Sequence, residues 1–344
     1  MSTTPRVAEA VFAFQAVTEL SAREVKAKAR STGVRPDFVL RAGGQDFIFQ
    51  MKGNSEVATV ARALDQLGEC LAQFRSATPV LVVPYMGEAG QALCRDAHVS
   101  WMDLSGNAHI VAAPLRVIIR GMPNRYVRRG RPRSVFAPKS ARVTRFLLLH
   151  PSEAFTQSEL ARRTHLTEGF ISRVVRALEA DGLLVRDDHG AVKPRDVSLL
   201  LDAWREAYEF AKHQIHRVHV VARNGEGATV AIAHALQASQ MEHAATGLSA
   251  AWLWAPFAAF RTATFYVERF DLKPLSELGA RKVESGENVW LVEPNDAGVY
   301  EGCATRNGVR CVSAIQTYMD LKGHRERAAE AAAELRRRMN AGER

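Results

Sequence analysis

The sequence predicts an α/β multidomain protein, and three observations support this class. Residues 1–122 alternate helical and strand patterns, which is typical of an α/β domain. Residues 140–212 are helical with one hairpin, and residues 213–344 are of mixed α+β character. A chain of 344 residues has room for two or three such domains. We therefore expect three domains with these bounds, joined by a linker at 123–139.

In the first domain, the spacing of apolar residues favours a mixed sheet with helices between its strands. The clearest helix covers 57–74, where apolar residues recur at helical spacing. The sequence TPVLVVP is a continuous apolar run, which is typical of a strand buried on both faces. Further helices are expected at 21–30 and 88–97, and further strands at 36–42, 46–52, 99–104, 109–113 and 115–120.

The last domain mixes the same two patterns. TGLSAAWLWAP predicts a buried helix and turn, in which Ser249 is a packed helix residue rather than a nucleophile, since the second glycine of a nucleophile elbow is missing. A charged helix is expected over 312–338. The other elements expected are strands at 216–222, 262–268, 287–294 and 308–313, and a helix at 229–243.

Composition narrows the class of partner. The formal net charge of +9 favours a polyanion. Residues 125–193 hold fourteen Lys/Arg against seven Asp/Glu, a net of +7, so most of the excess lies in one fifth of the chain. The longest uncharged run, 244–260, is short and broken by proline, which argues against a membrane span. The four cysteines form no CxxC pair, which predicts reduced thiols in a cytosolic protein and no zinc site.

Residues 140–194 carry the pattern of a winged helix-turn-helix. In SARVTRFLLLH, apolar residues share one face of a first helix. A second helix starts in FTQSELARRT, where Thr156 is the expected N-cap and Glu159 completes a capping box. A helical adaptor of the same fold that contacts protein is the alternative. The basic outer face of the next helix favours DNA over that alternative.

The third helix of this pattern, FISRVVRALEADG, follows the turn HLTEG. Its apolar residues recur at i, i+3, i+4 and i+7, so they are expected in the core, while the polar face is left for base edges and phosphates. A strand, a turn at 187–190 and a second strand then predict a wing. The candidate DNA contacts are Gln157, Arg162, Thr167, Ser172, Arg173, Arg176, Arg186 and Lys193.

The linker at 123–139 is rich in arginine and proline and cannot build a core. It is either a solvated tether or a basic arm that touches phosphates or the minor groove beside the winged helix. The residues that would make such an arm basic are Arg128, Arg129, Arg131 and Arg133.

Two short motifs in the first domain, Pro36-Asp37 and Gln50-Met51-Lys52, stand on consecutive predicted strands. They and the order of elements over about 20–112 resemble the restriction-endonuclease-like PD-(D/E)xK family. The resemblance implies a Mg²⁺ site held by two carboxylates, with a lysine beside the attacking water. Here Gln50 replaces one carboxylate, and Glu24, expected on the preceding helix, is a further acidic candidate. Alternatively, Asp37 pairs locally and Lys52 is solvated.

The sequences TGLSAAWLWAPF, ENVWLVEPNDAGVY and IQTYMDLKGHRERAAEAAAELRRR follow the winged helix. Together they resemble AbiEi-type antitoxins of type IV toxin–antitoxin systems over about 140–340. The resemblance implies a repressor that binds the operator of its own operon and counters a nucleotidyltransferase toxin. The nuclease-like first domain departs from a minimal antitoxin. GLSAAWLWAPFAAFRTATFYVER also resembles the start of a nucleotidyltransferase fold, but Glu268 and Asp271 lack the spacing of its metal pair, which implies an inactive domain.

The sequence leaves two main functional hypotheses. The first is a regulator or antitoxin of double-stranded DNA, without catalysis or cofactor, acting as a homodimer because paired winged helices gain specificity. The second is a Mg²⁺-dependent nuclease that the winged helix targets to DNA. They differ at Gln50, since an active enzyme needs a carboxylate there or nearby. An accessory protein of plasmid maintenance would share the DNA chemistry of the first hypothesis.

Overall fold

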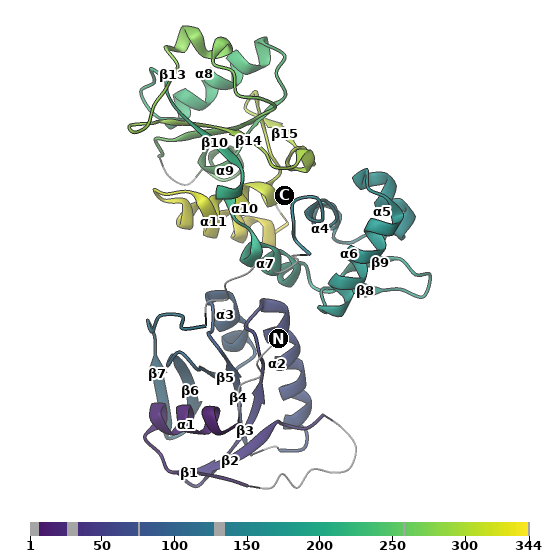
Figure 1. The fold of residues 1–344 in the computed structure, drawn as a ribbon, viewed down its shortest axis with the longest axis vertical. Coiled ribbons are helices and arrows are strands. Elements are labelled where there is room, and N and C mark those ends of the chain that lie inside the picture. The colour runs from purple at the N-terminus through teal and green to yellow at the C-terminus, as the bar shows by residue number, and fades with distance from the viewer. Residues whose placement is uncertain (1–6, 26–33, 75, 127–134, 257–258, 343–344) are drawn as a thin grey trace. The chain divides into compact units, whose positions relative to one another are not determined.

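The computed structural model describes residues 7–25, 34–74, 76–126, 135–256 and 259–342. The chain forms two compact units, and each is described by itself. The first unit contains residues 1–132 together with 179–183, and the second contains 133–178 together with 184–344 (Figure 1). The predicted winged helix-turn-helix lies almost wholly in the second unit, which also contains the C-terminal elements.

The first unit is built on a seven-stranded mixed sheet whose spatial order follows the sequence. The central strands β3, β4 and β5 pair in parallel, and the outer pairs are antiparallel. The strands are β1 (Ala22–Glu24), β2 (Phe38–Ala42), β3 (Gln45–Met51), β4 (Thr78–Val83), β5 (Ser100–Asp103), β6 (Ala108–Ala112) and β7 (Leu115–Ile119).

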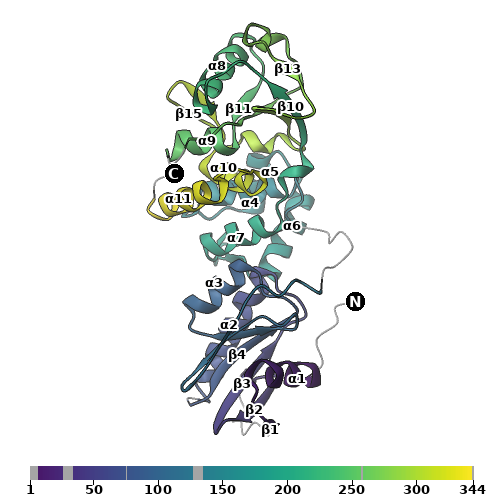
Figure 2. The same cartoon turned by 90° about the vertical axis from the view of Figure 1, so that its left-hand side faces the viewer.

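Helices cover both faces of this sheet because successive side chains of a strand point to opposite faces. Helix α1 (Val7–Thr18) packs on one face, where Phe14 meets Phe47 and Phe49 of β3. Helices α2 (Val57–Leu71) and α3 (Glu88–Asp96) pack on the other face, which takes Ile48 of the same strand (Figure 2). The strand β3 is therefore buried on both sides and forms the centre of the unit.

The start of the first unit differs from the sequence-based prediction. Helix α1 was not expected, because its apolar residues occupy nearly every position and give no clear period. The helix predicted at 21–30 is wrong at its beginning, where residues 22–24 form β1. Pairing of β1 with β2, which joins Ala22 to Ala42 and Glu24 to Leu40, overrides the local helical pattern. Residues 26–33 lie outside the described part of the chain.

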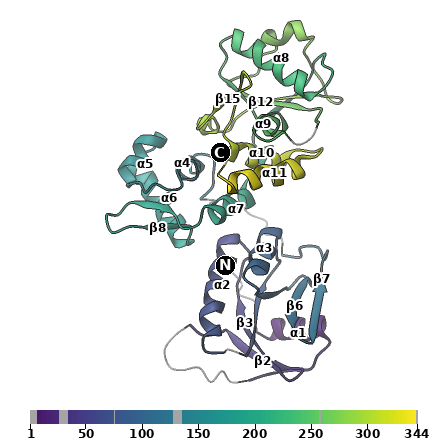
Figure 3. The same cartoon turned by 180° about the vertical axis from the view of Figure 1, so that it is seen from behind.

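The second unit begins with the helices and hairpin of the winged helix (Figure 3). The hairpin of β8 and β9 is antiparallel, and an isolated bridge from Phe155 to Val192 adds a third short segment to it. The elements are α4 (Ala141–Leu149), α5 (Gln157–Thr164), α6 (Glu168–Ala180), β8 (Leu184–Arg186), β9 (Val192–Pro194) and, beyond the hairpin, α7 (Val197–Ala207).

A second seven-stranded mixed sheet forms the C-terminal part of this unit, in the order β13-β10-β14-β12-β11-β16-β15. Its parallel pairs are β12 with β14 and β11 with β16. The strands are β10 (Gln214–His219), β11 (His243–Ala245), β12 (Ala263–Val267), β13 (Arg281–Lys282), β14 (Val289–Glu293), β15 (Ala304–Arg306) and β16 (Val309–Cys311). The helices are α8 (Gly225–Ala238), α9 (Gly247–Trp254), α10 (Ala314–Asp320) and α11 (Ala328–Asn340), with 3-10 helices η1 (Phe210–Lys212), η2 (Lys273–Leu278), η3 (Ala297–Tyr300) and η4 (Leu321–Gly323).

The single charged helix expected over 312–338 is in fact two helices. Every residue of α10 is buried, whereas α11 buries one face and carries its arginines on the other. The chain turns between them at η4, where Gly323 packs so closely on Phe210 that an added Cβ would lie 2.3 Å from its side chain. The buried helix α10 is therefore followed directly by the amphipathic helix α11. The charge pattern of the sequence alone does not show where one ends and the other begins. None of the helices in the described residues is long and apolar enough to cross a membrane.

Candidate DNA-binding surface

Helix α6 presents one face to the core and the other to solvent. The carbonyl oxygen of Thr167 accepts a hydrogen bond from the amide of Ile171 at 3.0 Å, which opens the helix where the sequence predicts. The four apolar residues expected in the core are all buried, so the helix cannot rotate about its axis without exposing them. These residues are Ile171, Val174, Val175 and Leu178.

The outer face of α6 carries the predicted cations. Arg173 and Arg176 are exposed, and Ser172 beside them is half-buried. The guanidinium of Arg173 lies 5.6 Å from the ring centroid of Phe170, and Nη2 of Arg176 donates to Oγ of Ser172 at 3.5 Å. These contacts are weak, so both arginines keep donors for phosphate or guanine.

Lys139, the last cation of the predicted basic linker, also belongs to this surface. Its Nζ lies 5.6 Å from the Phe170 ring, the same ring that Arg173 approaches. Lys139 precedes α4, some thirty residues earlier in the chain, and only the fold brings it to the start of α6. The one sequence signal was its position at the end of the basic linker.

Helix α5 is fixed at its N-terminus by the predicted capping box. The hydroxyl oxygen of Thr156 accepts from the amide of Glu159, whose carboxylate in turn accepts from the amide and hydroxyl of Thr156. The helix ends at His165, which adopts a left-handed φ of 54° and turns the chain toward α6. Gln157 occupies the first position of α5, and Arg162 is exposed near its end.

The wing is a tight hairpin with its cations outside. Asp187 Oδ1 accepts from the amides of His189 and Ala191, which closes the turn predicted at 187–190. Arg186 is exposed and its Nη1 donates to the carbonyl of Gly190 at 2.7 Å, while Lys193 is exposed on β9. The candidate arm residues Arg128, Arg129, Arg131 and Arg133 lie outside the described residues.

In the first unit, the nuclease-like residues come together at one end of β3. Oδ2 of Asp37 accepts from Nε2 of Gln50 at 2.8 Å and from the amide of Met51 at 2.6 Å. Nζ of Lys52 donates to Oε1 of Gln66, a residue of α2, at 2.5 Å. Burial lowers the pKa of Lys52, and the charge of Asp37 partly offsets this effect. Glu24 does not lie on a helix as expected, and stands exposed on β1.

This donor set does not fit the Mg²⁺ site that the PD-(D/E)xK resemblance implies. Asp37 is the one carboxylate among these converging side chains, and its Oδ2 already accepts two hydrogen bonds. Buried Oε1 of Gln50 has no hydrogen-bond partner among the described residues, but a neutral amide is a weak ligand for a hard cation. Nowhere in the described chain do three His, Cys, Asp or Glu side chains gather as metal ligands.

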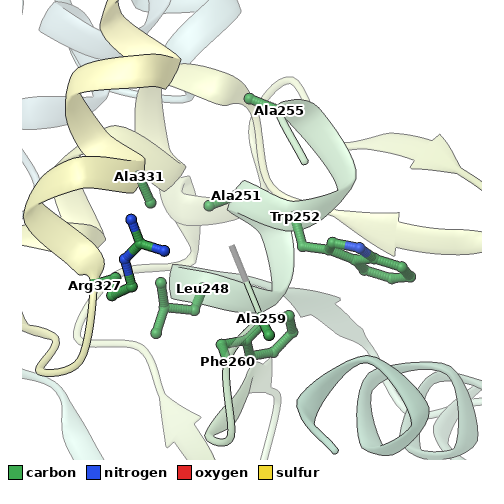
Figure 4. A pocket seen from close by; sticks show the side chains of 8 residues that line it. All are labelled: Leu248, Ala251, Trp252, Ala255, Ala259, Phe260, Arg327 and Ala331. Carbon is green, nitrogen blue, oxygen red and sulfur yellow. The ribbon is translucent and has the colours of Figure 1, made fainter. Parts of the chain in front are cut away.

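The C-terminal sheet offers little space for a small molecule beside α9. Ser249 is buried, and its Oγ accepts from the amide of Thr264 at 3.1 Å, in agreement with the packed role expected for it. A pocket lined by Leu248, Trp252 and Phe260 has a volume of about 10 Å³ (Figure 4). That volume holds about one water molecule.

The comparisons with known proteins bear on the winged helix alone. No curated protein and no solved structure matches the chain. Residues 138–192, which include α4, α5, α6 and most of the hairpin, match the model of the MarR family. This segment is therefore a MarR-type winged-helix DNA-binding domain, and the chain carries the DNA-binding module of a transcriptional regulator.

Proposed function

We propose that the protein is a sequence-specific repressor that binds double-stranded DNA of its own operon, as an AbiEi-like antitoxin without catalytic activity. The observation that supports it best is the division of α6, with Ile171 and Val175 locked in the core and Arg173 and Arg176 exposed on the outer face. Charge buried without a partner is costly, so these arginines stay available to the major groove.

The wider role rests on the resemblance of residues 140–340 to AbiEi-type antitoxins. It includes a partner, a nucleotidyltransferase-type toxin encoded beside this gene, and a homodimer that presents two winged helices to a two-fold operator. The C-terminal sheet is the part of the chain left for such protein contacts. Static light scattering of the full chain with and without DNA tests the assembly: a monomer mass in both cases would contradict the homodimer.

The repressor role is tested with a reporter gene placed behind the DNA upstream of this protein's own gene. Expression of the wild-type chain should lower the reporter signal, and expression of Arg173→Ala together with Arg176→Ala should restore it. A scrambled upstream sequence is the control. Repression that persists in the folded double variant would contradict the proposed reading surface.

A Mg²⁺-dependent nuclease is the second candidate, and the convergence of Asp37, Gln50 and Lys52 is the observation that favours it. The missing second carboxylate weighs against it. We therefore propose that the first unit serves a structural or binding role in the regulator and does not cut DNA.

A further inference from the structure

The strand β7 forms an open edge of the sheet in the first unit (Figure 1). Its residues, Leu115–Ile119, pair antiparallel with β6, and among the described residues no strand lies on the other side of β7. Alternate N–H and C=O groups of an edge strand point away from its neighbour and can bond a further strand. The backbone of β7 is therefore free to pair with an added strand.

Apolar side chains are exposed or half-buried on both faces of this edge. The core beneath α2 and α3 takes residues from β2 to β5 and none from β6 or β7. On that face, Val111 of β6 and Ile118 of β7 are 50% and 44% exposed. On the α1 face, Leu115 and Val117 pack at the margin of the core, and Ile119 is half-buried. Apolar surface beside an open strand edge is typical of a site that a partner covers.

The cations of the edge lie on the same face as Ile118. Arg116 and Arg120 stand two residues before and two residues after it, and side chains of a strand alternate between the faces. Both arginines are exposed, and neither has an ion-pair partner among the described residues. Burial lowers the pKa of His109, which lies opposite Ile118 on β6, and the charges of Arg120 and Arg116 lower it further. This face of the edge is therefore positively charged.

The two faces of β7 select different side chains on an added strand. The residues of such a strand also alternate between the faces and contact those of β7 across the pair. Carboxylates on one face would meet Arg116 and Arg120, and apolar side chains on the other face would continue the row that ends at Ile119. From this pattern we propose that β7 binds an extended segment of a partner protein in which acidic residues alternate with apolar ones.

Two other occupants fit this edge less well. A second copy paired through β7 would bring the arginines of both chains to one joint and would supply no carboxylate to them. Nucleic acid would pair its phosphates with Arg116 and Arg120, but it would leave the apolar row and the open backbone without a partner. The proposed contact is independent of the repressor role, since both arginines lie outside the winged helix.

The test is fluorescence anisotropy of the full-length chain with a short labelled peptide of alternating valine and glutamate. A peptide of alternating valine and lysine is the control for charge. We expect saturable binding of the glutamate peptide and binding of the lysine peptide that is weaker by about tenfold or more. Equal binding of the two peptides, or binding of neither, would overturn the proposal. Displacement of the glutamate peptide by a short DNA duplex of arbitrary sequence would assign the site to nucleic acid instead.

Hydrogen exchange of the full-length chain locates the contact. Amides of residues 115–119 should exchange more slowly when the glutamate peptide is bound, because an added strand bonds those that point away from β6. Slower exchange confined to other segments would contradict a site on β7.

Charge reversal separates this edge from the rest of the basic surface. Arg116→Glu together with Arg120→Glu changes exposed side chains alone, and it should transfer binding from the glutamate peptide to the lysine peptide. The matched control is Arg23→Glu, an exposed arginine of β1 at the opposite edge of the same sheet, which should bind the glutamate peptide like the wild type. Circular dichroism checks the fold of each variant. The same loss in Arg23→Glu, or full binding of the glutamate peptide by the folded double variant, would rule out the assignment.

Discussion

Arg142 and Asp296 form a bidentate ion pair, although 154 residues separate them in the chain. Asp296 also accepts from the amide of Gly298 at 2.7 Å, so one carboxylate both anchors α4 and shapes η3. The side chains of Arg142 and Asp296 are 26% and 12% exposed, which shields the pair from solvent screening. A paired, half-buried contact of this kind contributes more than a surface ion pair.

We predict that Arg142→Ala and Asp296→Ala each destabilise the second unit, Asp296→Ala more because it also loses the bond to Gly298. A double-mutant cycle by urea denaturation should give a coupling energy of about 1–3 kcal/mol. The exposed pair Lys212–Glu209 is the control and should give about 0.5 kcal/mol or less. Equal coupling in the two cycles would contradict a special role for the first pair.

In DNA binding, Arg173→Ala should cost on the order of 1–3 kcal/mol with the operator while the fold stays intact, if Arg173 reads guanine. Arg186→Ala or Lys193→Ala in the wing should weaken operator and scrambled duplex alike and lower the salt slope by about one. The measurement is a titration of both labelled duplexes at two salt concentrations, with circular dichroism as the folding control. A folded Arg173→Ala variant that binds both duplexes like the wild type would show that α6 is not the reading helix.

Three buried groups of the second unit predict how stability depends on pH. Burial raises the pKa of Asp320 to about 6, and it lowers the pKa of His213 and of His324 to about 4. The two histidines contribute stability that is present above about pH 6.5 and lost as the pH falls to 4. Asp320 acts in the opposite direction, since its contribution is present below about pH 4 and lost as the pH rises to 6.

We therefore expect a net loss of stability between pH 6.5 and 4, because two histidines outweigh one carboxyl group. Each shift corresponds to about 3 kcal/mol. Asp320→Asn removes the opposing contribution, so its loss over the same pH window should be steeper than that of the wild type. Urea midpoints measured in half-unit steps of pH test this expectation. Parallel pH profiles for the two chains would contradict it.

Gly247 at the start of α9 is a site where a methyl group should be costly. Its φ is +54°, and an added Cβ would lie 2.3 Å from Nε2 of His324, whose ring is backed by Trp290 at a centroid distance of 4.8 Å. We predict that Gly247→Ala lowers the free energy of unfolding by roughly 3 kcal/mol or more, from the left-handed backbone and the contact together.

The matched control for Gly247→Ala is Gly286→Ala, with a φ of +76° and no atom within 4 Å of the added Cβ. It should lose only the backbone contribution, about 1–2 kcal/mol. Equal losses in the two variants would mean that the ring of His324 moves away freely.

For the first unit, we expect no cleavage of supercoiled plasmid with Mg²⁺ or Mn²⁺, because Gln50 and Asp37 offer a single carboxylate. Agarose gels over a range of metal concentrations check this, with the metal removed by chelation as the blank. Nicking that disappears in both Asp37→Ala and Lys52→Ala would overturn the expectation.

Local chemistry made the winged helix predictable in detail. The capping box of Thr156 and Glu159 and the buried stripe of α6 depend on residues three and four apart, and both were confirmed. Contacts between distant residues gave no such signal. Arg145 showed no role in the sequence, because its partner Gln316 lies 171 residues away. Glu24 lies on a strand and not on the predicted helix, because β1 pairs with β2, and this pairing is a tertiary effect.

The contacts of helix α4 limit how this DNA-binding domain can be exchanged or redesigned. The helix belongs to the MarR-type segment, yet its Arg142 and Arg145 hold Asp296 and Gln316 of the C-terminal part. A fragment cut after Pro194 would leave the guanidinium groups of Arg142 and Arg145 without these partners. The domain should therefore not be transferred on its own. A change of operator preference should be made by substitutions on the outer face of α6 alone.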